Sequence, residues 1–447
     1  MKFALLSQKT NLSLFTVITC LLTSSPSFAC PDLNRFYELM EGDPSSVEAG
    51  LAPFLAECAE SSEYFALLGA SQLSTGNLFQ ALENLELSLL LDPNNGAALV
   101  DYAEVLFRQG QVLSALELNE ELLDRNDLPG GLKDGLALRQ RRWSRATIIS
   151  NGMVSGSVGH DNNLNSAPLG DQLALTLSGK SVILDVSPEY KSQGGGYTKL
   201  SAGMNFTRLG QSFNSQFSGQ LRGRFGKDSQ YELLQGSMQG RLSPAGDSPG
   251  WDAMAGLDHI VFGGNTIFSS STVTARYFLG GTRSCNFYPR LALQYQYFHS
   301  QRSLSGVESS LGVGADCRLA LGSAPSRLSV EASAISNNGT ERDRLGEDRG
   351  GWQMNFIWQS QIGQGQILAQ YVLTELDDEA GYSPLFAGGA KREESLDSAF
   401  LQYTQPIRNF SQNAQFFANV SYHSQTSTID LFKTRGITAE IGVNWGF

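Results

Sequence analysis

The strongest constraint on this chain is an alternation of apolar and polar residues that runs to its last residue. Successive side chains of an extended strand point to opposite faces, so the segment from Arg435 to Phe447 has one apolar and one polar face. Such a strand suits a barrel whose outer face meets lipid, or a sandwich with one solvated face. The apolar positions are Ile437, Ala439, Ile441, Val443, Trp445 and Phe447.

Similar alternation recurs from Ala146 onward, and turn residues divide it into about fourteen strands. An even number returns the last strand to the side of the membrane from which the first one starts. Two further alternating stretches, 173–177 and 182–186, fall in a long insertion between the first two strands. We place the strands at 150–159, 196–207, 213–225, 230–242, 251–262, 269–280, 287–299, 307–321, 327–337, 351–363, 365–376, 396–408, 412–424 and 434–447.

The predicted connections alternate between short turns and long polar loops. Residues 209–211 and 363–365 are short, whereas 336–349 and 375–394 are long. Outer-membrane barrels have short periplasmic turns and long external loops, so this order predicts the orientation of the barrel. Tryptophans near strand ends are typical of an aromatic girdle. Those near predicted ends are Trp251, Trp352 and Trp445, and Trp358 is nearer the middle of its strand.

The first 29 residues have the pattern of a secretory signal peptide. Lysines precede an apolar run at 12–22, and a small-x-small site ends at Ala29. We therefore expect cleavage between Ala29 and Cys30. A cysteine in the first mature position is also where a lipoprotein is acylated, although the bulky Phe28 does not suit that processing.

Export also affects the expected oxidation state of the five cysteines. Cys20 leaves with the signal peptide, and periplasmic thiols tend to be oxidised. The natural pairs within each domain are Cys30 with Cys58 and Cys285 with Cys317. Free buried thiols are the alternative.

A short helical repeat precedes the strands. Residues 62–95 align with 96–129 at a shift of 34 residues, the tetratricopeptide period. Small residues let paired helices approach closely, glycine closes the turn between them, and proline ends a helix. Residues 33–59 look helical and suit a cap, and a generic array of helical hairpins is the alternative. The motif positions are Leu68, Gly69, Gly76, Ala81 and Pro93, then Tyr102, Ala103, Gly110 and Ala115.

Most of the net charge of −12 lies on this helical segment. Residues 30–145 contain 19 acidic and 8 basic side chains, a net charge of −11. Because proteins grip phosphate backbones with clustered Lys and Arg, nucleic acid is not an expected partner. Four arginines crowd the end of the segment, where they either meet anionic headgroups or a pore rim, or form a solvated helix end. They are Arg139, Arg141, Arg142 and Arg145.

No catalytic signature occurs in the sequence. It has no Gly-x-Ser-x-Gly elbow, phosphate-binding glycine loop, His-Glu-x-x-His or Cys-x-x-Cys, so we predict neither an enzyme nor a cofactor. Histidines on one barrel rim could bind a metal or respond to pH, although solvated or interfacial side chains are the simpler expectation. The four histidines, His160, His259, His299 and His423, all fall near strand ends that we place on one side.

The segment after the first predicted strand carries a family resemblance. Residues 159–168 read Gly-His-Asp-Asn-Asn-Leu-Asn-Ser-Ala-Pro, with Asp161, Asn163, Asn165 and Pro168 as the matching positions. This motif stands between a helical-repeat domain and a barrel whose last residue is phenylalanine. The arrangement resembles the surface lipoprotein assembly modifier (Slam) family. Because Asn and Asp also favour turns, a simple loop start is the alternative.

The resemblance implies an α+β multidomain fold: a signal peptide at 1–29, a periplasmic tetratricopeptide-repeat domain at 30–145 and an outer-membrane β-barrel of about 14 strands at 146–447. It implies a translocon that delivers a client lipoprotein or secreted protein. Its other expected partners are outer-membrane lipid and the barrel insertion machinery, which reads a terminal signal formed here by Ile441, Val443, Trp445 and Phe447. The rival function is an exopolysaccharide export porin, which calls for a charged and aromatic track. Inward positions instead read mostly as Ser, Gly, Gln, Asn and Thr.

Overall fold

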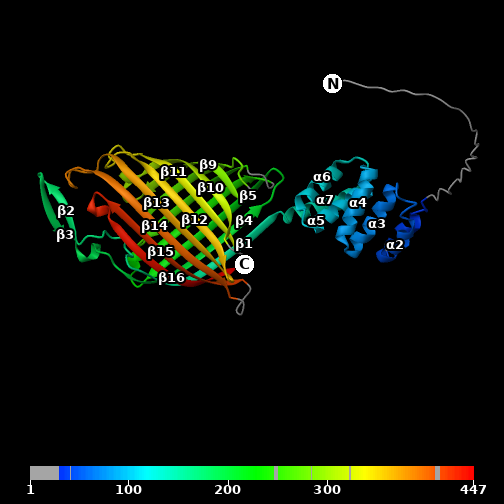
Figure 1. Cartoon of the computed structure of the whole chain (residues 1–447), viewed down its shortest axis with the longest axis horizontal. Coiled ribbons are helices and arrows are strands. Elements are labelled where there is room, and N and C mark those ends of the chain that lie inside the picture. The colour runs from blue at the N-terminus through cyan, green and yellow to red at the C-terminus, as the bar shows by residue number, and fades with distance from the viewer. Residues whose placement is uncertain (1–29, 41, 246–249, 283, 322–323, 408–412) are drawn as a thin grey trace, which may run out of the picture. The chain divides into compact units, whose positions relative to one another are not determined.

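The structure is a computed structural model that describes residues 30–40, 42–245, 250–282, 284–321, 324–407 and 413–447. The predicted signal peptide, with Ala29 of its cleavage site, lies outside these residues. The chain divides into two compact units with a boundary between Trp143 and Ser144, the first helical and the second built of strands (Figure 1). Among the described residues, no helix has both the length and the apolarity needed to cross a membrane.

The helical unit consists of successive helices joined by short turns. Each predicted repeat contains one helix pair, α3 with α4 and α5 with α6, and the predicted cap contains α1 and α2. A further helix, α7, follows the second repeat and leads to the first strand. The bounds are α1 (Asn34–Met40), α2 (Pro44–Leu51), η1 (Ala52–Phe54), α3 (Ser62–Thr75), α4 (Leu78–Leu91), α5 (Gly96–Arg108), α6 (Val112–Asp124) and α7 (Gly130–Arg145).

Small residues set the spacing of these helices. A Cβ atom on Gly69 would lie 2.6 Å from Cγ of Leu85, so only glycine lets α3 pack this closely on α4. Ala81, Ala103 and Ala115 are fully buried at the helix contacts. Gly76 ends α3 in the left-handed conformation, with φ of 87°, which glycine adopts without a steric penalty. In the cap, a disulfide joins Cys30 to Cys58.

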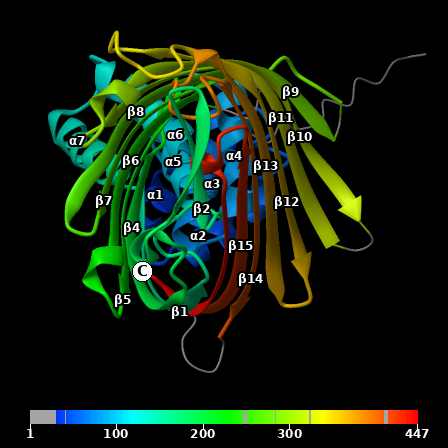
Figure 2. The ribbon, with the colours of Figure 1, turned by 90° about the vertical axis from the view of Figure 1, so that its left-hand side faces the viewer.

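The second unit is a closed antiparallel barrel of fourteen strands, which confirms the predicted fold. Neighbouring strands are consecutive in sequence except that β1 pairs with both β4 and β16. Viewed end-on, the strands form a ring (Figure 2). The bounds are β1 (Ile148–Asp161), β4 (Gly195–Arg208), β5 (Phe213–Gly226), β6 (Leu233–Pro244), β7 (Trp251–Phe262), β8 (Asn265–Tyr277), β9 (Cys285–Phe298), β10 (Gly306–Leu321), β11 (Ala324–Gly339), β12 (Arg349–Ile362), β13 (Gly365–Gly381), β14 (Lys391–Pro406), β15 (Ala414–Ser427) and β16 (Thr434–Gly446).

Most strand boundaries shift by a few residues from the sequence prediction, and the changes around β8 and two loops have a clear cause. Strand β8 begins at Asn265 instead of 269, because Gly263 and Gly264 make a two-residue turn with positive φ at both positions. The loops predicted at 336–349 and 375–394 shrink to 340–348 and 382–390, since the strands on either side continue through their charged residues. The alternating insertion forms a separate hairpin of β2 (Gln172–Leu177) and β3 (Lys180–Asp185).

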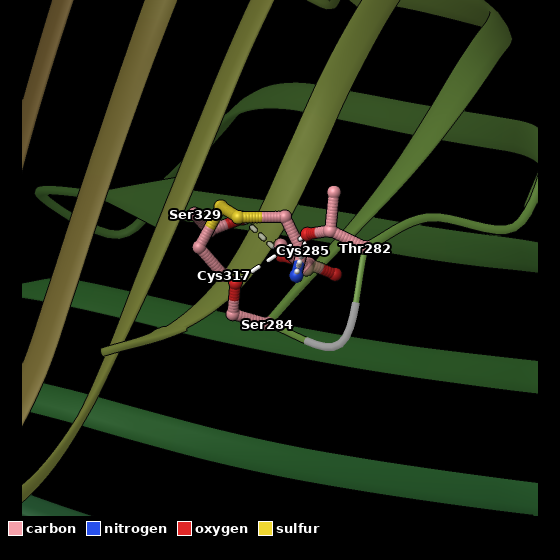
Figure 3. The surroundings of a disulfide bond; sticks show 6 residues. Thr282, Ser284, Cys285, Cys317 and Ser329 are labelled. Atoms are coloured by element: carbon pink, nitrogen blue, oxygen red, sulfur yellow. Dashed lines mark hydrogen bonds between the residues drawn. A yellow bond between two sulfur atoms is a disulfide. The ribbon is translucent and has the colours of Figure 1, made fainter. Parts of the chain in front are cut away.

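A second disulfide lies within the barrel wall. Cys285 of β9 and Cys317 of β10 face each other directly across the two strands and are joined through their sulfur atoms (Figure 3). The backbone N–H of Cys285 donates to Oγ1 of Thr282 at 3.1 Å. The bridge therefore fastens two adjacent strands at one end of the barrel.

Candidate functional site

The strand register separates an apolar outer face from a polar inner face. Directly opposed residues share a face, so Leu200, Leu221 and Leu257 lie outward with exposed fractions of 55%, 68% and 58%. We call the end that holds the first residue of β1 and the last of β16 the terminal end, and the opposite end the loop end. All fourteen strands run between these two ends. The barrel thus has the apolar exterior and polar interior of a membrane barrel.

Uncharged polar side chains line much of the inner face between β1 and β8. A lumenal cavity of about 510 Å³ lies against this wall. Its lining combines amides and hydroxyls, which both donate and accept hydrogen bonds, with a few methionines. Such a surface can form hydrogen bonds with peptide groups or with sugars. The polar lining residues include Asn205, Ser218, Gln220, Gln239, Thr272 and Thr274.

Charged inner residues at the loop end form the first ion-pair cluster, on β12, β13 and β14. Asp378 is 3% exposed and lies 2.9 Å from Nε of Arg349 and 3.0 Å from Nη2 of Arg392. Arg349 also pairs with Glu394, which accepts a hydrogen bond from Gln425 at 2.8 Å. These charges are largely neutralised by one another, so they brace the wall of the barrel.

A second ion-pair cluster lies toward the terminal end. Asp252 of β7 is 1% exposed and is held by Arg241 of β6 at 2.7 Å and Arg276 of β8 at 2.6 Å. Farther round the wall, Arg290 pairs with Glu331 at 3.4 Å. Sequence reasoning missed both clusters, because each pair joins different strands and depends on their register.

The seam where the barrel closes joins its first and last strands. Strand β1 pairs with β4 along its whole length, from Ile148 to Asp161. With β16 it pairs only from Met153 opposite Gly446 to Asp161 opposite Thr438. At the terminal end Gly152 and Phe447 extend this pairing through two backbone hydrogen bonds of 2.7 and 2.9 Å.

The segment that resembles the Slam family extends the seam at the loop end. Nδ2 of Asn163 donates to the carbonyl oxygens of Ala167 at 3.0 Å and Arg435 at 3.1 Å, and Asn163 is 3% exposed. Pro168 makes a bridge to Thr434, and the N–H of Leu169 donates to the carbonyl of Lys433 at 2.7 Å. Residues 162–169 therefore follow the edge of β16, and the bond from Asn163 to Ala167 is a local side-chain-to-backbone contact typical of turns.

The other matched residues of this segment hold it in place. The carboxylate of Asp161 accepts from the N–H of Asn163 at 2.8 Å and from Arg224 of β5 at 3.0 Å. Asn165 bonds to the chain on its other side, donating to the carbonyl of Lys191 at 2.9 Å and accepting from the N–H of Gln193 at 3.0 Å. Each matched polar side chain thus has a defined structural role.

Side chains of β4 reach across β1 to the last strand. Glu440 of β16 accepts from the hydroxyl of Tyr197 at 2.7 Å and from Lys199 at 3.1 Å. Between them, Gly159 of β1 has no side chain, and a Cβ atom there would lie 2.8 Å from the Tyr197 ring. We call Tyr197, Lys199 and Glu440 the seam clamp. It closes the seam over β1 from inside the barrel.

The remaining predicted site residues separate into two groups. Ile441, Val443, Trp445 and Phe447 all lie on the outward side of the last strand or just beyond it. The four histidines do not form one site. His423 faces inward against Gly436, whereas His259 and His299 lie together on the outer face, linked through Ser269.

Alternate helices of the first unit contribute polar residues to one face. Burial, followed by the carboxylates of Glu63 and Asp101, raises the pKa of the Tyr37 phenol, so α1, α3 and α5 bring these three side chains close together. Burial raises the pKa of Asp101 to about 6, with Arg139 of α7 opposing the shift. We call Tyr37, Glu63, Asp101 and Arg139 the helical face.

Arg139 is held differently from the other arginines of its cluster. Its Nε donates to Asn119 at 2.8 Å, Nη1 donates to the carbonyl of Val100 at 3.0 Å, and its guanidinium lies 4.5 Å from the Trp143 ring. This side chain therefore joins α7 to the repeats and is not a free headgroup-binding charge. Arg141, Arg142 and Arg145 are all exposed.

Comparison with known proteins gives no family. No protein-family model and no curated protein matches the chain. Among solved structures, the type III secretion translocator chaperone SycD of Yersinia enterocolitica is similar at 18% identity, over 26% of this chain and 84% of that one, with a TM-score of 0.23. A bacterial polysaccharide outer membrane secretin (8%, 67% and 98%, TM-score 0.34) and OmpT of Vibrio cholerae (8%, 67% and 97%, TM-score 0.33) are similar to the barrel.

Proposed function

We propose that this protein is an outer-membrane translocon that delivers client lipoproteins or secreted proteins to the cell surface, and that it is related to the Slam family. The terminal end of the barrel would face the periplasm, where the helical unit would engage clients or partners. The observation that carries the proposal is the segment from Asp161 to Pro168. Its family-like side chains are built into the loop end of the seam, with Asn163 buried against β16.

The helical unit supports this function through its charge and its face. A net charge of −11 on residues 30–145 favours basic client segments over acidic ones. The helical face carries a phenol and two carboxylates on alternate helices, with Arg139 engaged beside them, an arrangement that suits an extended peptide or a helix.

The barrel supports peptide passage more than strong ligand binding. Its best-defined inner charges are neutralised in ion pairs, and the lumenal cavity presents mostly amides and hydroxyls. A translocating chain needs many weak and replaceable hydrogen bonds, which these amides and hydroxyls can supply, and Arg222 and Asp258 are the charged residues of the cavity lining. Outward-facing Ile441, Val443, Trp445 and Phe447 would form the signal read by the insertion machinery.

One observation favours the polysaccharide exporter as a second candidate. Phe268 and Phe298 face inward near the loop end, with ring centroids 5.0 Å apart. Aromatic rings stack on sugars, and Gln294 and Gln296 lie on the same face of β9. A second pair, Phe278 and Tyr288, lies toward the terminal end of the same strands with ring centroids 5.4 Å apart, and the inner face of β8 between the two pairs carries hydroxyls instead of rings.

Deletion followed by surface labelling separates the two functions. In cells that lack the protein, we expect a lipoprotein or secreted protein to disappear from the surface while its total amount is unchanged. Surface glycan should stay at its normal level. Loss of surface glycan with normal protein display would overturn the proposal in favour of the exporter.

A point variant tests the segment that carries the proposal. Asn163→Ala should reduce client display while the protein still reaches the outer membrane, since one hydrogen bond to β16 and two within the segment are lost. Asn265→Ala is the matched control at the same end of the barrel, because its side chain donates only within its own turn. Equal display by both variants would contradict a role for the segment in delivery.

A further inference from the structure

An apolar groove crosses the outer surface of the barrel from β4 to β7. It has a volume of about 550 Å³. Its outward lining includes the small residues Ala202, Gly219 and Gly236, beside the large side chains of Leu221 and Met238. Because the outer face of a membrane barrel is turned to lipid, this hollow lies where an acyl chain can enter it.

The groove runs obliquely along the wall between two defined residues. The row of directly opposed outward residues leads from Trp445 of β16 through Val154, Ala202, Leu221 and Gly236 to His259, near the loop end of β7. Phe447 lines the groove where that row starts, and His259 lines it where the row ends. An acyl chain lying in the groove would therefore pass from the loop end toward the terminal end, as a lipid does within its leaflet.

A polar cluster begins where the groove meets His259. Oγ of Ser269 lies 2.8 Å from Nδ1 of His259 and 2.9 Å from Nε2 of His299, on three adjacent strands or their ends. A hydroxyl carries one hydrogen, so it donates to one imidazole and accepts from the other. Within the described residues no partner is seen for Nε2 of His259 or Nδ1 of His299. These two nitrogens remain available to a ligand.

The surroundings of the cluster match the headgroup level of a membrane. Tyr295 and Tyr297 lie on the same outward face of β9, and the Tyr297 ring is 4.7 Å from that of His299. Tyrosines are enriched where apolar lipid meets water. Structural zinc sites use four protein ligands, and no group of three or more His, Cys, Asp or Glu suited to a metal occurs among the described residues. An anionic headgroup is therefore the better fit.

We propose that this surface binds one lipid with a phosphorylated headgroup, its phosphoryl group at the cluster of His259, Ser269 and His299 and one acyl chain in the groove. The imidazole that accepts from Ser269 would donate its other N–H to a phosphoryl oxygen, and the apolar lining would cover the chain. The site is separate from the lumen and the seam clamp. Lipid binding at this site does not depend on whether the barrel delivers proteins.

Native mass spectrometry of the full-length protein in detergent tests the site. The probes are dioleoyl phosphatidylglycerol, dioleoylglycerol and inorganic phosphate. We expect one phosphatidylglycerol to bind, with affinity about tenfold above dioleoylglycerol, since each hydrogen bond to a charged group contributes about 1.5–3 kcal/mol. Equal binding of the two lipids overturns the headgroup assignment. Inorganic phosphate that competes fully with the lipid at equal concentration overturns the role of the acyl chain.

Two variants and a matched control complete the test. The double variant His259→Ala/His299→Ala and the groove-filling Gly219→Leu should each weaken phosphatidylglycerol binding about tenfold. A Cβ atom on Gly219 meets nothing within 4 Å, so leucine fits there and fills the groove. Gly240→Leu is the control, since this outward glycine is equally open and lies outside the groove. Heat-dependent gel mobility verifies that the barrel of each variant is folded. Wild-type binding by either folded site variant overturns the proposal.

Discussion

The helical unit buries large apolar side chains and exposes most of its charges, whereas the barrel exposes large apolar side chains and encloses several charges. In the helical unit Leu85 and Tyr64 are fully buried and most charges are at the surface. In the barrel Leu221 and Leu311 are exposed on the outer face, whereas Asp252 and Asp378 are buried inside. One chain therefore combines a fold stabilised by an apolar core with a fold braced by enclosed ion pairs. Equivalent substitutions should have opposite consequences in the two units.

The largest effect should come from removing a buried lumenal carboxylate. Asp252→Ala leaves Arg241 and Arg276 without their common partner, and breaking a buried pair costs about 3–5 kcal/mol. Urea-dependent unfolding of the barrel in lipid vesicles measures the loss. Asp258→Ala, on the same strand and face, is the control, because Asp258 makes no ion pair among the described residues. Equal stability of the two variants would show that the ion pairs do not brace the wall.

A core deletion should act on the helical unit alone. Leu85→Ala should lower its free energy of unfolding by about 3 kcal/mol, because Leu85 is fully buried against Gly69. Circular dichroism at a helical wavelength during heating follows this unit. Leu90→Ala, in the same helix at 78% exposure, should change stability by less than about 0.5 kcal/mol. If the barrel lost stability as well, the two units would not be separate.

Neighbouring residues of β10 should differ in their tolerance of charge. Leu311→Arg places a charge on the lipid face and should destabilise the barrel by about 2 kcal/mol in vesicles. Ser310→Arg faces the polar lumen and should cost less, although it loses the hydrogen bond that Arg290 donates at 3.1 Å. The reverse order would mean that the inner and outer faces are assigned the wrong way round.

The smallest effect concerns the pH dependence of the helical unit. The pKa of Asp101 is raised to about 6 by burial, from an ordinary value of 3.8, so the folded chain holds its proton more tightly than the unfolded chain. The free energy of unfolding should therefore fall as pH rises between about 4 and 6. Asp101→Asn should be more stable than wild type by about 1 kcal/mol at pH 7 and equal to it near pH 4, in thermal unfolding.

The pKa of Asp127 shifts in the opposite direction to that of Asp101, so Asp127 is a control for this prediction. A hydrogen bond from Arg125 lowers the pKa of Asp127 to about 2. Its charged form is thus favoured in the folded chain, and Asp127→Asn should bring no gain at pH 7. A gain in both variants would point to the general acidity of the unit rather than to the burial of Asp101.

Local patterns predicted the strands because each one alternates and most end at recognisable turns. The prediction failed at the start of β8, where Asn265 to Phe268 already belong to the strand because the chain turns tightly at Gly263 and Gly264. It also treated charged residues near Asp378 and Glu394 as loop, although the strands continue through them. Their partner Arg349 is 45 residues from Glu394, so only the folded register explains why these charges are buried.

The candidate site could likewise be predicted only in part, because its contacts depend on the strand register. The family-like form marked Asp161 and Asn163 in the sequence, yet their contacts reach Arg224 and Arg435, which no local spacing reveals. Likewise His259 and His299 are brought together by Ser269 of the strand between them, a residue without any distinctive sequence signal. Side chains that act across strands become visible only with the register.

The meeting of Asn163 with Arg435, 272 residues apart, also governs the order of assembly. The ring cannot be completed until the final hairpin has been synthesised, so every shorter chain is an open sheet with two unpaired edges. Pairing so remote in sequence is slow to form. During that interval the free edges of β1 and β15 need protection from aggregation, and a chain truncated before β16 should be degraded rather than inserted.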